Sequence, residues 1–249
     1  MSISNDLHVL AQGLGGARTF DFSQGKAFKV APETEWTTPT KTWKDQGKMY
    51  KMVLRNNSPM GGVCATICAF WIVFHAKQGA GDIAHSFTKD RSVWEYLFDD
   101  GGLNLGAAQN ITCEHYLSTG NQLNYLENFM SKFSIDRRTQ NMAGSPIANM
   151  FTPLNNSTTF QCAEAITKVG GYKLIQLKKT HNGSGGGHMV SAWSDGEDVL
   201  FMDPNMGEFW LPNMTSFKIW LASFLLKLTC ETTNINQCES TISPEGECC

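Results

Sequence analysis

The stretch from Gly61 to His75 is the feature that most constrains how this chain folds. Its sequence, GGVCATICAFWIVFH, begins with two glycines and then places apolar side chains on every face of a helix. A helix that has no polar face has to be buried. We therefore predict a buried central helix that the remainder of the chain must cover.

Cys64 falls in the first turn of this helix, where backbone N–H groups and the positive end of the helix dipole favour a thiolate. The dipole supplies only about 0.3 to 1 kcal/mol, which is less than one pKa unit. By itself, then, Cys64 is most simply a small core residue. A catalytic Cys64 needs an imidazolium close by, and His75 does not supply it, because the helix rise places it about 16 Å away.

The composition is that of an ordinary globular protein, with 249 residues, 41% hydrophobic content and a formal net charge of -3. This charge gives no indication of nucleic-acid binding, and the basic run from Lys41 to Arg55 is short and interrupted. The longest apolar run, from Ile67 to Phe74, is far below the roughly 20 residues of a membrane span. We expect neither a nucleic-acid partner nor an integral membrane segment, and the sequence leaves the oligomeric state open.

The eight cysteines are scattered along the chain, and the N-terminus lacks the charged start and apolar core of a cleaved signal peptide. Both observations favour reduced thiols in a cytosol-like compartment. Cys64 and Cys68 share a helix face, but no Cys-x-x-Cys or His-x-x-x-His pattern completes a metal-binding set. We therefore expect no metal and no cofactor.

Composition divides the chain into three parts. Residues 1–45 are rich in Ser, Thr, Gly, Gln and Pro and are predicted to form an extended or partly ordered leader, and residues 231–249 a disordered polar tail. Residues 46–230 are predicted to form a single folded domain. Within it, periodicity predicts helices over 121–133, 157–169 and 214–228, a loop over 134–156, and strands over 172–178, 188–193, 199–203 and 208–211.

A histidine and an aspartate lie on either side of a predicted hairpin. Asp195-Gly196 is typical of a two-residue turn, in which Ser194 pairs with Glu197. That register places His188 directly opposite Asp203, with Cβ atoms roughly 4.5 to 5.5 Å apart. A three-residue loop would send the two side chains to opposite faces, and a four-residue loop would make them diagonal neighbours. Taken singly, His188 fits a core histidine and Asp203 a turn-starting residue before Pro204.

A glycine run, Gly183-Ser184-Gly185-Gly186-Gly187, precedes His188. It lacks the Lys-Ser/Thr of a phosphate loop and enters a strand instead of a helix. We interpret it as backbone that leaves room for a substrate chain to approach.

Three blocks of sequence resemble a known family. They are Gly61-Gly62-Val63-Cys64 leading into an apolar helix, His188 with its apolar successor, and Phe201-Met202-Asp203-Pro204-Asn205-x-Gly207-Glu208-Phe209. Together they resemble the YopT/AvrPphB effector cysteine peptidases over about residues 56 to 211. The resemblance implies an α+β, papain-like fold in which a buried, nucleophile-bearing helix packs on an antiparallel sheet.

The same resemblance implies roles for individual residues. Cys64 would be the nucleophile, His188 the general base that later protonates the leaving amine, and Asp203 the residue that orients it. The oxyanion would be held by the Cys64 backbone N–H and by an upstream side-chain amide, for which Asn57 is the nearest candidate.

The leading hypothesis is a thiol peptidase made in a bacterial cytosol, secreted without a cleaved signal peptide, and cleaving protein substrates inside a host or target cell. The same triad also fits a deamidase or transglutaminase-like acyltransferase. A third hypothesis is a catalytically silent binding module. The terminal Glu247-Cys248-Cys249 resembles the ends of doubly geranylgeranylated proteins, and the sequence leaves that modification open.

Overall fold

The central element is an antiparallel sheet. The structure, a computed structural model, describes residues 2–23, 64–78, 126, 129–131, 133–138, 150–151, 156–168, 170–181, 184–228 and 232–240. Within these ranges the strand order is β1-β7-β6-β5-β4-β8-β2, and β3 also pairs with β8. The strands are β1 (Ala17–Phe20), β2 (Ile135–Arg138), β3 (Met150–Phe151), β4 (Gly171–His181), β5 (Ser184–Ser194), β6 (Val199–Asp203), β7 (Gly207–Leu211) and β8 (Thr232–Ser240).

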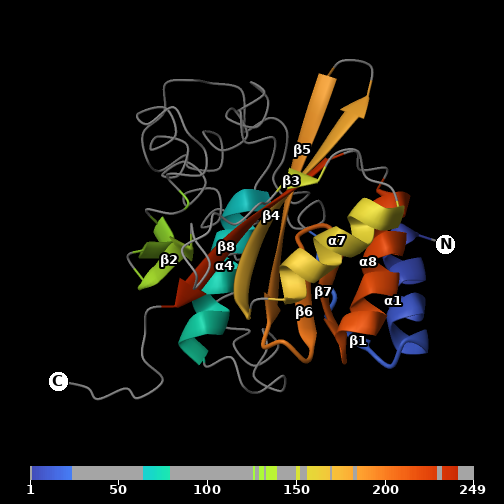
Figure 1. Ribbon diagram of the computed structural model, residues 1–249, viewed down its shortest axis with the longest axis horizontal. Helices are drawn as coiled ribbons and strands as arrows, with labels where there is room; N and C mark the ends of the chain where they lie inside the picture. The colour runs from blue at the N-terminus through green and yellow to red at the C-terminus, as the bar shows by residue number, and fades with distance from the viewer. Residues whose placement is uncertain are drawn as a thin grey trace, which may run out of the picture.

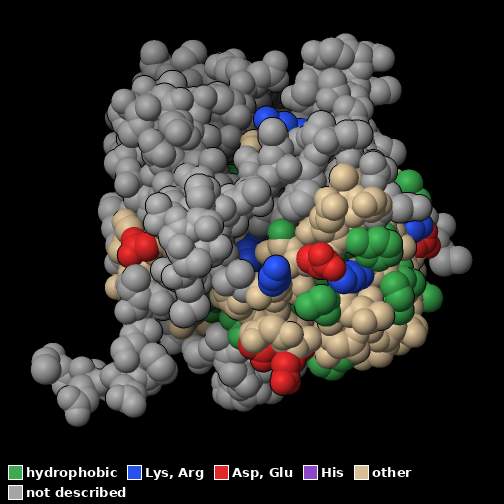
Figure 2. Space-filling model, in the orientation of Figure 1, with side chains coloured by type: hydrophobic (Ala, Val, Ile, Leu, Met, Phe, Trp, Pro, Cys, Tyr) green, Lys and Arg blue, Asp and Glu red, His purple; other side chains and the backbone are tan. Residues whose placement is uncertain are grey.

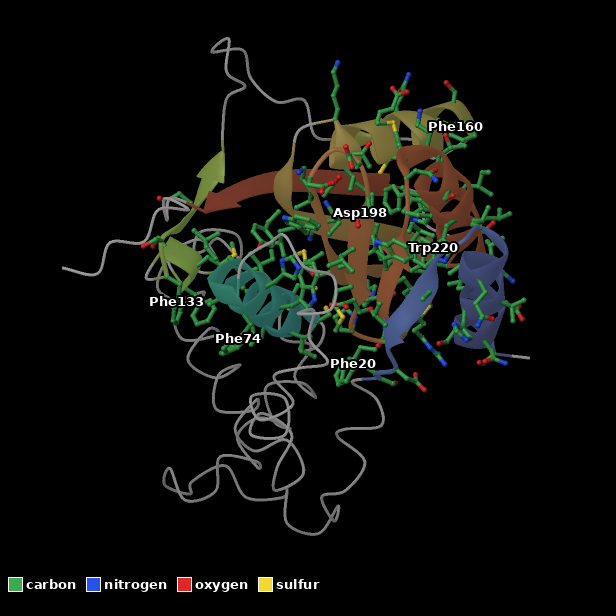
Figure 3. The ribbon with its side chains drawn as sticks, turned by 90° about the horizontal axis from the view of Figure 1, so that it is seen from below. Phe20, Phe74, Phe133, Phe160, Asp198 and Trp220 are labelled. Atoms are coloured by element: carbon green, nitrogen blue, oxygen red, sulfur yellow. The ribbon has the colours of Figure 1, made fainter. Side chains whose placement is uncertain are left out.

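Helices cover both faces of this sheet (Figures 1 and 3). One face carries α4 (Cys64–Gln78), and the other carries α1 (Ile3–Gly13), α7 (Asn156–Thr167) and α8 (Met214–Lys227). Side chains of β4 alternate between these layers, since Leu174 joins the α4 cluster and Ile175 the opposite one. The expected α+β arrangement, in which a buried helix packs on an antiparallel sheet, is confirmed.

The helix α4 is as buried as its composition requires. Ile67, Trp71 and Ile72 have no exposed surface. Its outer side is also covered, because the Phe70 ring packs against Phe129 with centroids 4.8 Å apart. The helix therefore lies between the sheet and further chain.

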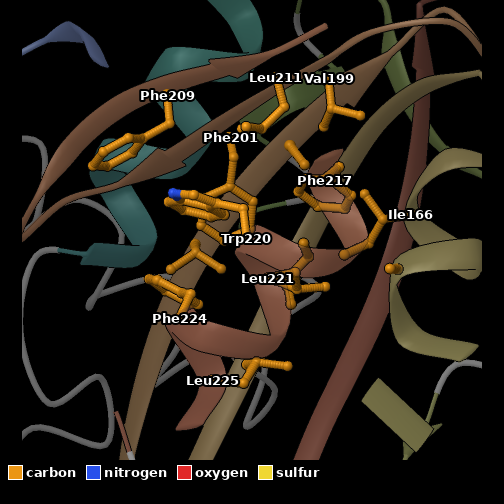
Figure 4. Packing of buried hydrophobic residues seen from close by; sticks show 14 of the residues in the cluster. Ile166, Val199, Phe201, Phe209, Leu211, Phe217, Trp220, Leu221, Phe224 and Leu225 are labelled. Atoms are coloured by element: carbon orange, nitrogen blue, oxygen red, sulfur yellow. The ribbon is translucent and has the colours of Figure 1, made fainter. Parts of the chain in front are cut away.

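The opposite layer is an aromatic core built on α8 (Figure 4). Trp220 lies 5.2 Å from Phe201, 4.9 Å from Phe209 and 5.3 Å from Phe224 between ring centroids. Asn213 caps the helix as its position predicts, accepting a hydrogen bond from the Ser216 N–H at 2.8 Å. This packing fixes β6 and β7, the strands that adjoin the candidate site.

Residues 3–20, which belong to the segment predicted as an extended or partly ordered leader, form a helix and a strand. Leu7 and Ala11, one helical turn apart, are fully buried, and the Leu7 carbonyl accepts a hydrogen bond from Trp220 Nε1 at 3.1 Å. The strand β1 then pairs with β7. Leu10 and Leu14 continue the apolar stripe of Leu7 and Ala11 at helical spacing and pack against the same core, so the polar segment did carry a helical pattern. Residues 24–45 lie outside the described ranges.

The prediction of a disordered tail is wrong for residues 232–240. The strand β8 pairs with β4 along seven residue pairs and with β2 and β3 on its other side. Its polar sequence shows no apolar alternation, so its order depends on backbone bonds to distant strands. The two short partners also replace parts of the loop predicted over 134–156. Residues 241–249 lie outside the described ranges, as do Asn57 and most of residues 79–134.

The visible surface over α7, α8 and α1 mixes acidic and basic side chains instead of collecting one sign (Figure 2). Two ion pairs bridge these helices, Lys218 with Glu164 at 2.9 Å and Lys227 with Asp6 at 2.8 Å. A search of the described residues finds no helix long and apolar enough to cross a membrane.

Candidate active site

The start of α4 lies against the start of β5. Cys64 opens the helix and is 4% exposed. One turn later the Cys68 thiol donates to the Met189 carbonyl with an S···O distance of 3.4 Å. Because His188 precedes Met189 directly, this contact brings the first turn of the helix and the imidazole into one region.

The hairpin that carries His188 and Asp203 differs from the predicted two-residue turn. Ser194 pairs with Val199, so the loop has four residues, Asp195 to Asp198. The Asp195 carboxylate accepts the N–H groups of Glu197 and Asp198 at 2.8 and 3.1 Å, which stabilises the longer loop. His188 and Asp203 are therefore diagonal neighbours, which is the outcome expected for a loop of this length.

His188 and Asp203 nevertheless meet. The imidazole Nε2 lies 2.9 Å from Asp203 Oδ1. The Asp203 side chain is fully buried, whereas that of His188 is 21% exposed. Since Nε2 is used by the carboxylate, Nδ1 is the nitrogen left for Cys64, which also bonds with this imidazole.

The turn after β6 holds the Asp203 carboxylate in place. Oδ1 also accepts the Asn205 backbone N–H at 2.7 Å, and the Met206 N–H donates to the Asp203 carbonyl at 3.0 Å. Gly207 follows with a φ of 101°, and a Cβ there would lie 2.0 Å from the Phe20 carbonyl oxygen. The Asp-Pro-Asn-x-Gly block is thus a turn motif that aims a carboxylate at His188, so Asp203 serves both as a turn residue and as the partner of His188.

Electrostatics favour a charged imidazole. Burial by itself lowers the pKa of His188, but the charge of Asp203, the hydrogen bond to that carboxylate and the interactions with Cys64 outweigh burial and raise the pKa to about 10. At neutral pH the structure therefore stabilises an imidazolium beside the Cys64 sulfur. A catalytic Cys64 needs such an imidazolium, because the helix dipole alone is too weak to favour the thiolate.

His75 has a different environment, as its distance along the helix indicates. Its Nδ1 lies 2.8 Å from the Tyr172 hydroxyl, and burial lowers its pKa to about 4. It is a neutral core residue at physiological pH. Among the described residues, no group of three or more His, Cys, Asp or Glu side chains is arranged to hold a metal ion.

Sequence reasoning missed one polar contact beside this region. Glu208 is fully buried, and its carboxylate accepts hydrogen bonds from Trp71 Nε1 at 2.7 Å and from the Thr19 hydroxyl at 2.5 Å. The residue was visible only as part of the block after Asp203. The available signal was a charged residue in a short strand whose other side chains, Phe209, Trp210 and Leu211, are apolar, since a buried charge needs a partner.

A cysteine that opens a buried helix, next to a histidine and an aspartate on an antiparallel sheet, defines the papain-like class of thiol peptidase site. The family model of Peptidase C58, described as Yersinia/Haemophilus virulence surface antigen, matches residues 11–239. The chain belongs to this family of cysteine peptidases, which are bacterial virulence effectors and toxins. The resemblance to the YopT/AvrPphB peptidases is confirmed.

Individual relatives are distant. Over 188 residues the chain is 22% identical to the protein adenylyltransferase and cysteine protease IbpA of Histophilus somni, a match that spans 72% of this chain and 4% of that protein. The Pseudomonas avirulence protein AvrPphB has a TM-score of 0.45 at 16% identity, covering 74% of this chain and 94% of the other. The YopT domain of the Pasteurella multocida PfhB2 toxin has a TM-score of 0.31 at 19% identity, covering 88% and 90%.

Proposed function

We propose that this chain is an active cysteine peptidase in which Cys64 is the nucleophile, His188 the general base and acid, and Asp203 the residue that orients His188. The observation that carries the proposal is the position of His188, whose imidazole bonds Asp203 through Nε2 at 2.9 Å and also interacts with the Cys64 side chain. Three residues from two distant parts of the sequence therefore supply a nucleophile, a proton carrier and its anchor.

The reaction follows from these positions. The Cys64 thiolate attacks the carbonyl carbon of the scissile bond, and the electron pair of that carbonyl moves to its oxygen. As the tetrahedral intermediate collapses, the C–N bond breaks and the His188 imidazolium gives its Nδ1 proton to the leaving amine. Neutral His188 then takes a proton from water, which attacks the thioester and releases the acid and the Cys64 sulfur.

The negative oxygen of the intermediate needs hydrogen-bond donors. Cys64 is the first residue of α4, so its backbone N–H has no acceptor within the helix and is free of the helical ladder. This N–H and the helix dipole suit an oxyanion. Asn57 stays the predicted second donor.

Gly187, next to His188, supports the approach of a peptide substrate. Gly187 is exposed, and a Cβ built on it would meet no atom closer than the Gln176 side-chain nitrogen at 4.0 Å. Neither packing nor a positive φ requires glycine at this strand position. We propose that the bare backbone instead leaves room for the substrate chain beside the imidazole.

The biological setting follows from the family. We propose that the chain is made in a bacterium, secreted without a cleaved signal peptide, and acts on protein substrates in a host or target cell. The 4% share of IbpA that the chain spans leaves the activities of that much larger protein outside this proposal.

The test is the rate of iodoacetamide labelling of Cys64 at pH 6, read by peptide mass spectrometry in wild type and in His188→Ala. Cys68, which burial makes harder to ionise by raising its pKa, is the internal control. We expect Cys64 to label at least tenfold faster than Cys68, and His188→Ala to remove that difference. If Cys64 and Cys68 label at equal rates in the wild-type protein, the peptidase proposal is contradicted and a binding module is favoured. Ammonia release from a target glutamine without chain cleavage would instead indicate the deamidase.

A further inference from the structure

Four side chains form one stripe along the sheet-facing side of α4. Cys64, Cys68, Trp71 and His75 are spaced by four, three and four residues, which places them on the same helix face. After Cys64, each makes a polar contact with a different strand: Cys68 with Met189 of β5, Trp71 with Glu208 of β7, and His75 with Tyr172 of β4.

Polar contacts of this kind fix what apolar packing leaves adjustable. A helix that is apolar on every face can rotate or slide by a small amount on a sheet and still bury the same surface. A hydrogen bond has a narrow range of distance and angle, so it selects one rotation and one height. The stripe therefore sets where the first turn of α4 lies relative to His188.

Within the stripe, the contact between Trp71 and Glu208 is the strongest. The other two acceptor groups are neutral, whereas Glu208 is a carboxylate, and both Trp71 and Glu208 are fully buried. Hydrogen bonds to a carboxylate are shorter and about twice as strong as neutral ones. Breaking this contact loses a buried hydrogen bond to a carboxylate, so alternative positions of α4 are disfavoured.

Glu208 also ties the helix to the N-terminal strand. Its second oxygen accepts the Thr19 hydroxyl at 2.5 Å, and β1 is packed so closely on β7 that Gly207 has no room for a side chain. The carboxylate is therefore held through both of its oxygens, one by Thr19 and one by Trp71. It is a fixed point against which α4 is positioned.

We propose that Glu208 is a positioning residue for the nucleophile: through Trp71 it sets the rotation and height of α4 so that the Cys64 sulfur lies at the imidazole of His188. Trp71 lies two helical turns after Cys64, about 10 Å along the axis. A shift of the helix by a fraction of a turn is carried to Cys64 undiminished, because the helix is rigid between them. This inference rests on the proposed function for its chemical consequence, although the position of the helix is independent of it.

The contact requires an acceptor at position 208, and this distinguishes the conservative variant from the disruptive one. In Glu208→Gln the amide oxygen still accepts the Trp71 N–H, while the amide N–H₂ donates to the Thr19 hydroxyl, which reverses its role. Glu208→Leu removes the acceptor of the Trp71 N–H. Trp71→Phe removes the donor and keeps the carboxylate.

The matched control is Trp220→Phe. Trp220 is equally buried and also donates from Nε1, to the Leu7 carbonyl at 3.1 Å, but it belongs to the aromatic core on the opposite face of the sheet. This variant removes the same atoms and a comparable hydrogen bond. It reports the effect of general destabilisation on the site.

Two readouts decide the proposal in folded protein. At pH 6, iodoacetamide labelling of Cys64 is expected to fall about tenfold in Glu208→Leu and in Trp71→Phe, and to stay within about threefold of wild type in Glu208→Gln and Trp220→Phe. The double variant Glu208→Leu/Trp71→Phe is expected to match the single variants instead of multiplying their effects, because both remove one shared contact. Amide hydrogen exchange in residues 64–71 is expected to rise in the same two variants only.

The proposal would be overturned if labelling of Cys64 and amide hydrogen exchange in Glu208→Leu proceeded at the rates of wild type. It would also be overturned if Trp220→Phe slowed the labelling of Cys64 as much as Glu208→Leu. A loss in Glu208→Gln as large as that in Glu208→Leu would also overturn it, since the negative charge and not the acceptor would then matter. If wild-type Cys64 labels no faster than Cys68, the peptidase proposal fails, and hydrogen exchange alone decides whether Glu208 positions the helix.

Discussion

The imidazole Nε2 of His188 lies 2.9 Å from Asp203 Oδ1, although the two residues are offset along β5 and β6 instead of facing each other. The pairs between β5 and β6 end at Ser191 and Met202, whereas His188 still pairs with Leu177 of β4 and Asp203 with Gly207 of β7. The contact therefore joins two side chains beyond the last β5–β6 pair. The turn that holds Asp203 is therefore as important for the contact between His188 and Asp203 as the pairing of the strands.

Asp203→Asn is expected to separate orientation from charge. The amide oxygen can still accept from His188 Nε2, so the ring keeps its direction, but the negative charge that raises the pKa of His188 is lost. We expect the pKa of His188 to fall by at least one unit from about 10, measured by NMR titration of the imidazole nitrogens. Asp203→Ala removes both effects and is expected to slow Cys64 labelling at pH 6 by about 100-fold.

A His188 pKa that stays near 10 in Asp203→Asn would contradict this assignment of the shift. Lys218→Gln, which removes a surface ion pair on α8, is the charge control. It is expected to leave the titration of His188 unchanged.

His75 is expected to make the protein less stable below pH 6.5. Its folded pKa of about 4 lies below the ordinary value of 6.5, so between these values the unfolded chain binds a proton that the folded chain does not. The free energy of unfolding therefore falls as the pH falls, by up to about 1.4 kcal/mol per pH unit. In the same range His188 is protonated in both states and contributes nothing.

Urea unfolding at pH 7 and pH 5 measures this effect. We expect wild type to lose about 2 kcal/mol more than His75→Gln, because glutamine keeps a hydrogen bond to Tyr172 without titrating. Equal losses in the two proteins would show that His75 titrates normally and is not buried as a neutral ring.

The raised pKa of His188 predicts the opposite trend at alkaline pH. Its stabilisation is fully present below pH 6.5 and is lost as the pH rises toward about 10. The difference in free energy of unfolding between wild type and His188→Gln is expected to shrink from pH 6.5 to pH 9. In this range His75 is neutral in both states, so the two histidines can be measured separately. A difference that stays constant would contradict the ion pair.

The sequence predicts those parts of the fold whose pattern is local. An all-apolar stretch is enough to predict a buried α4, and alternation predicts β4 to β7. It does not predict β8, because a strand of polar residues is recognised only by its pairing with β4. The helix α1 was missed for another reason: Leu7, Leu10, Ala11 and Leu14 recur at helical spacing, but the composition of the surrounding segment is polar.

The site is predictable to the same extent. Strand parity is enough to place His188 and Asp203 on one face, but the register was wrong by two residues, because the Asp195 side chain stabilises a longer loop than Asp-Gly indicates. The contact of Glu208 with Trp71 joins residues 137 positions apart, and no spacing rule predicts it.

Truncation tests the corrected C-terminus. A chain that ends at residue 231 lacks β8 and leaves one edge of β4 unpaired, together with the attachment of β2 and β3. We expect it to lose its cooperative thermal unfolding transition, whereas a chain that ends at residue 240 keeps it. Thermal unfolding followed by circular dichroism measures both. Similar unfolding midpoints in the two truncated chains would contradict a stabilising role of β8.

Substitution of Gly187 tests whether the absence of a side chain at this position leaves room for the substrate chain. A valine at this exposed strand position has room in the free protein and is expected to leave stability unchanged or slightly higher, since valine favours strands. The same side chain would occupy the space beside His188 through which a peptide approaches. Iodoacetamide is small enough to pass, but a peptidyl chloromethyl ketone has to place its chain there.

The prediction is therefore a change in selectivity between two reagents. In Gly187→Val we expect labelling of Cys64 by iodoacetamide to stay within about twofold of wild type and labelling by the peptidyl reagent to fall at least tenfold, the cost of roughly one lost backbone hydrogen bond and a steric clash. Gly13→Ala, at a glycine that also has open space around it but lies at the end of α1, is the matched control. Equal losses with both reagents would mean that valine disturbs His188 itself, and no loss with either would place the substrate chain elsewhere.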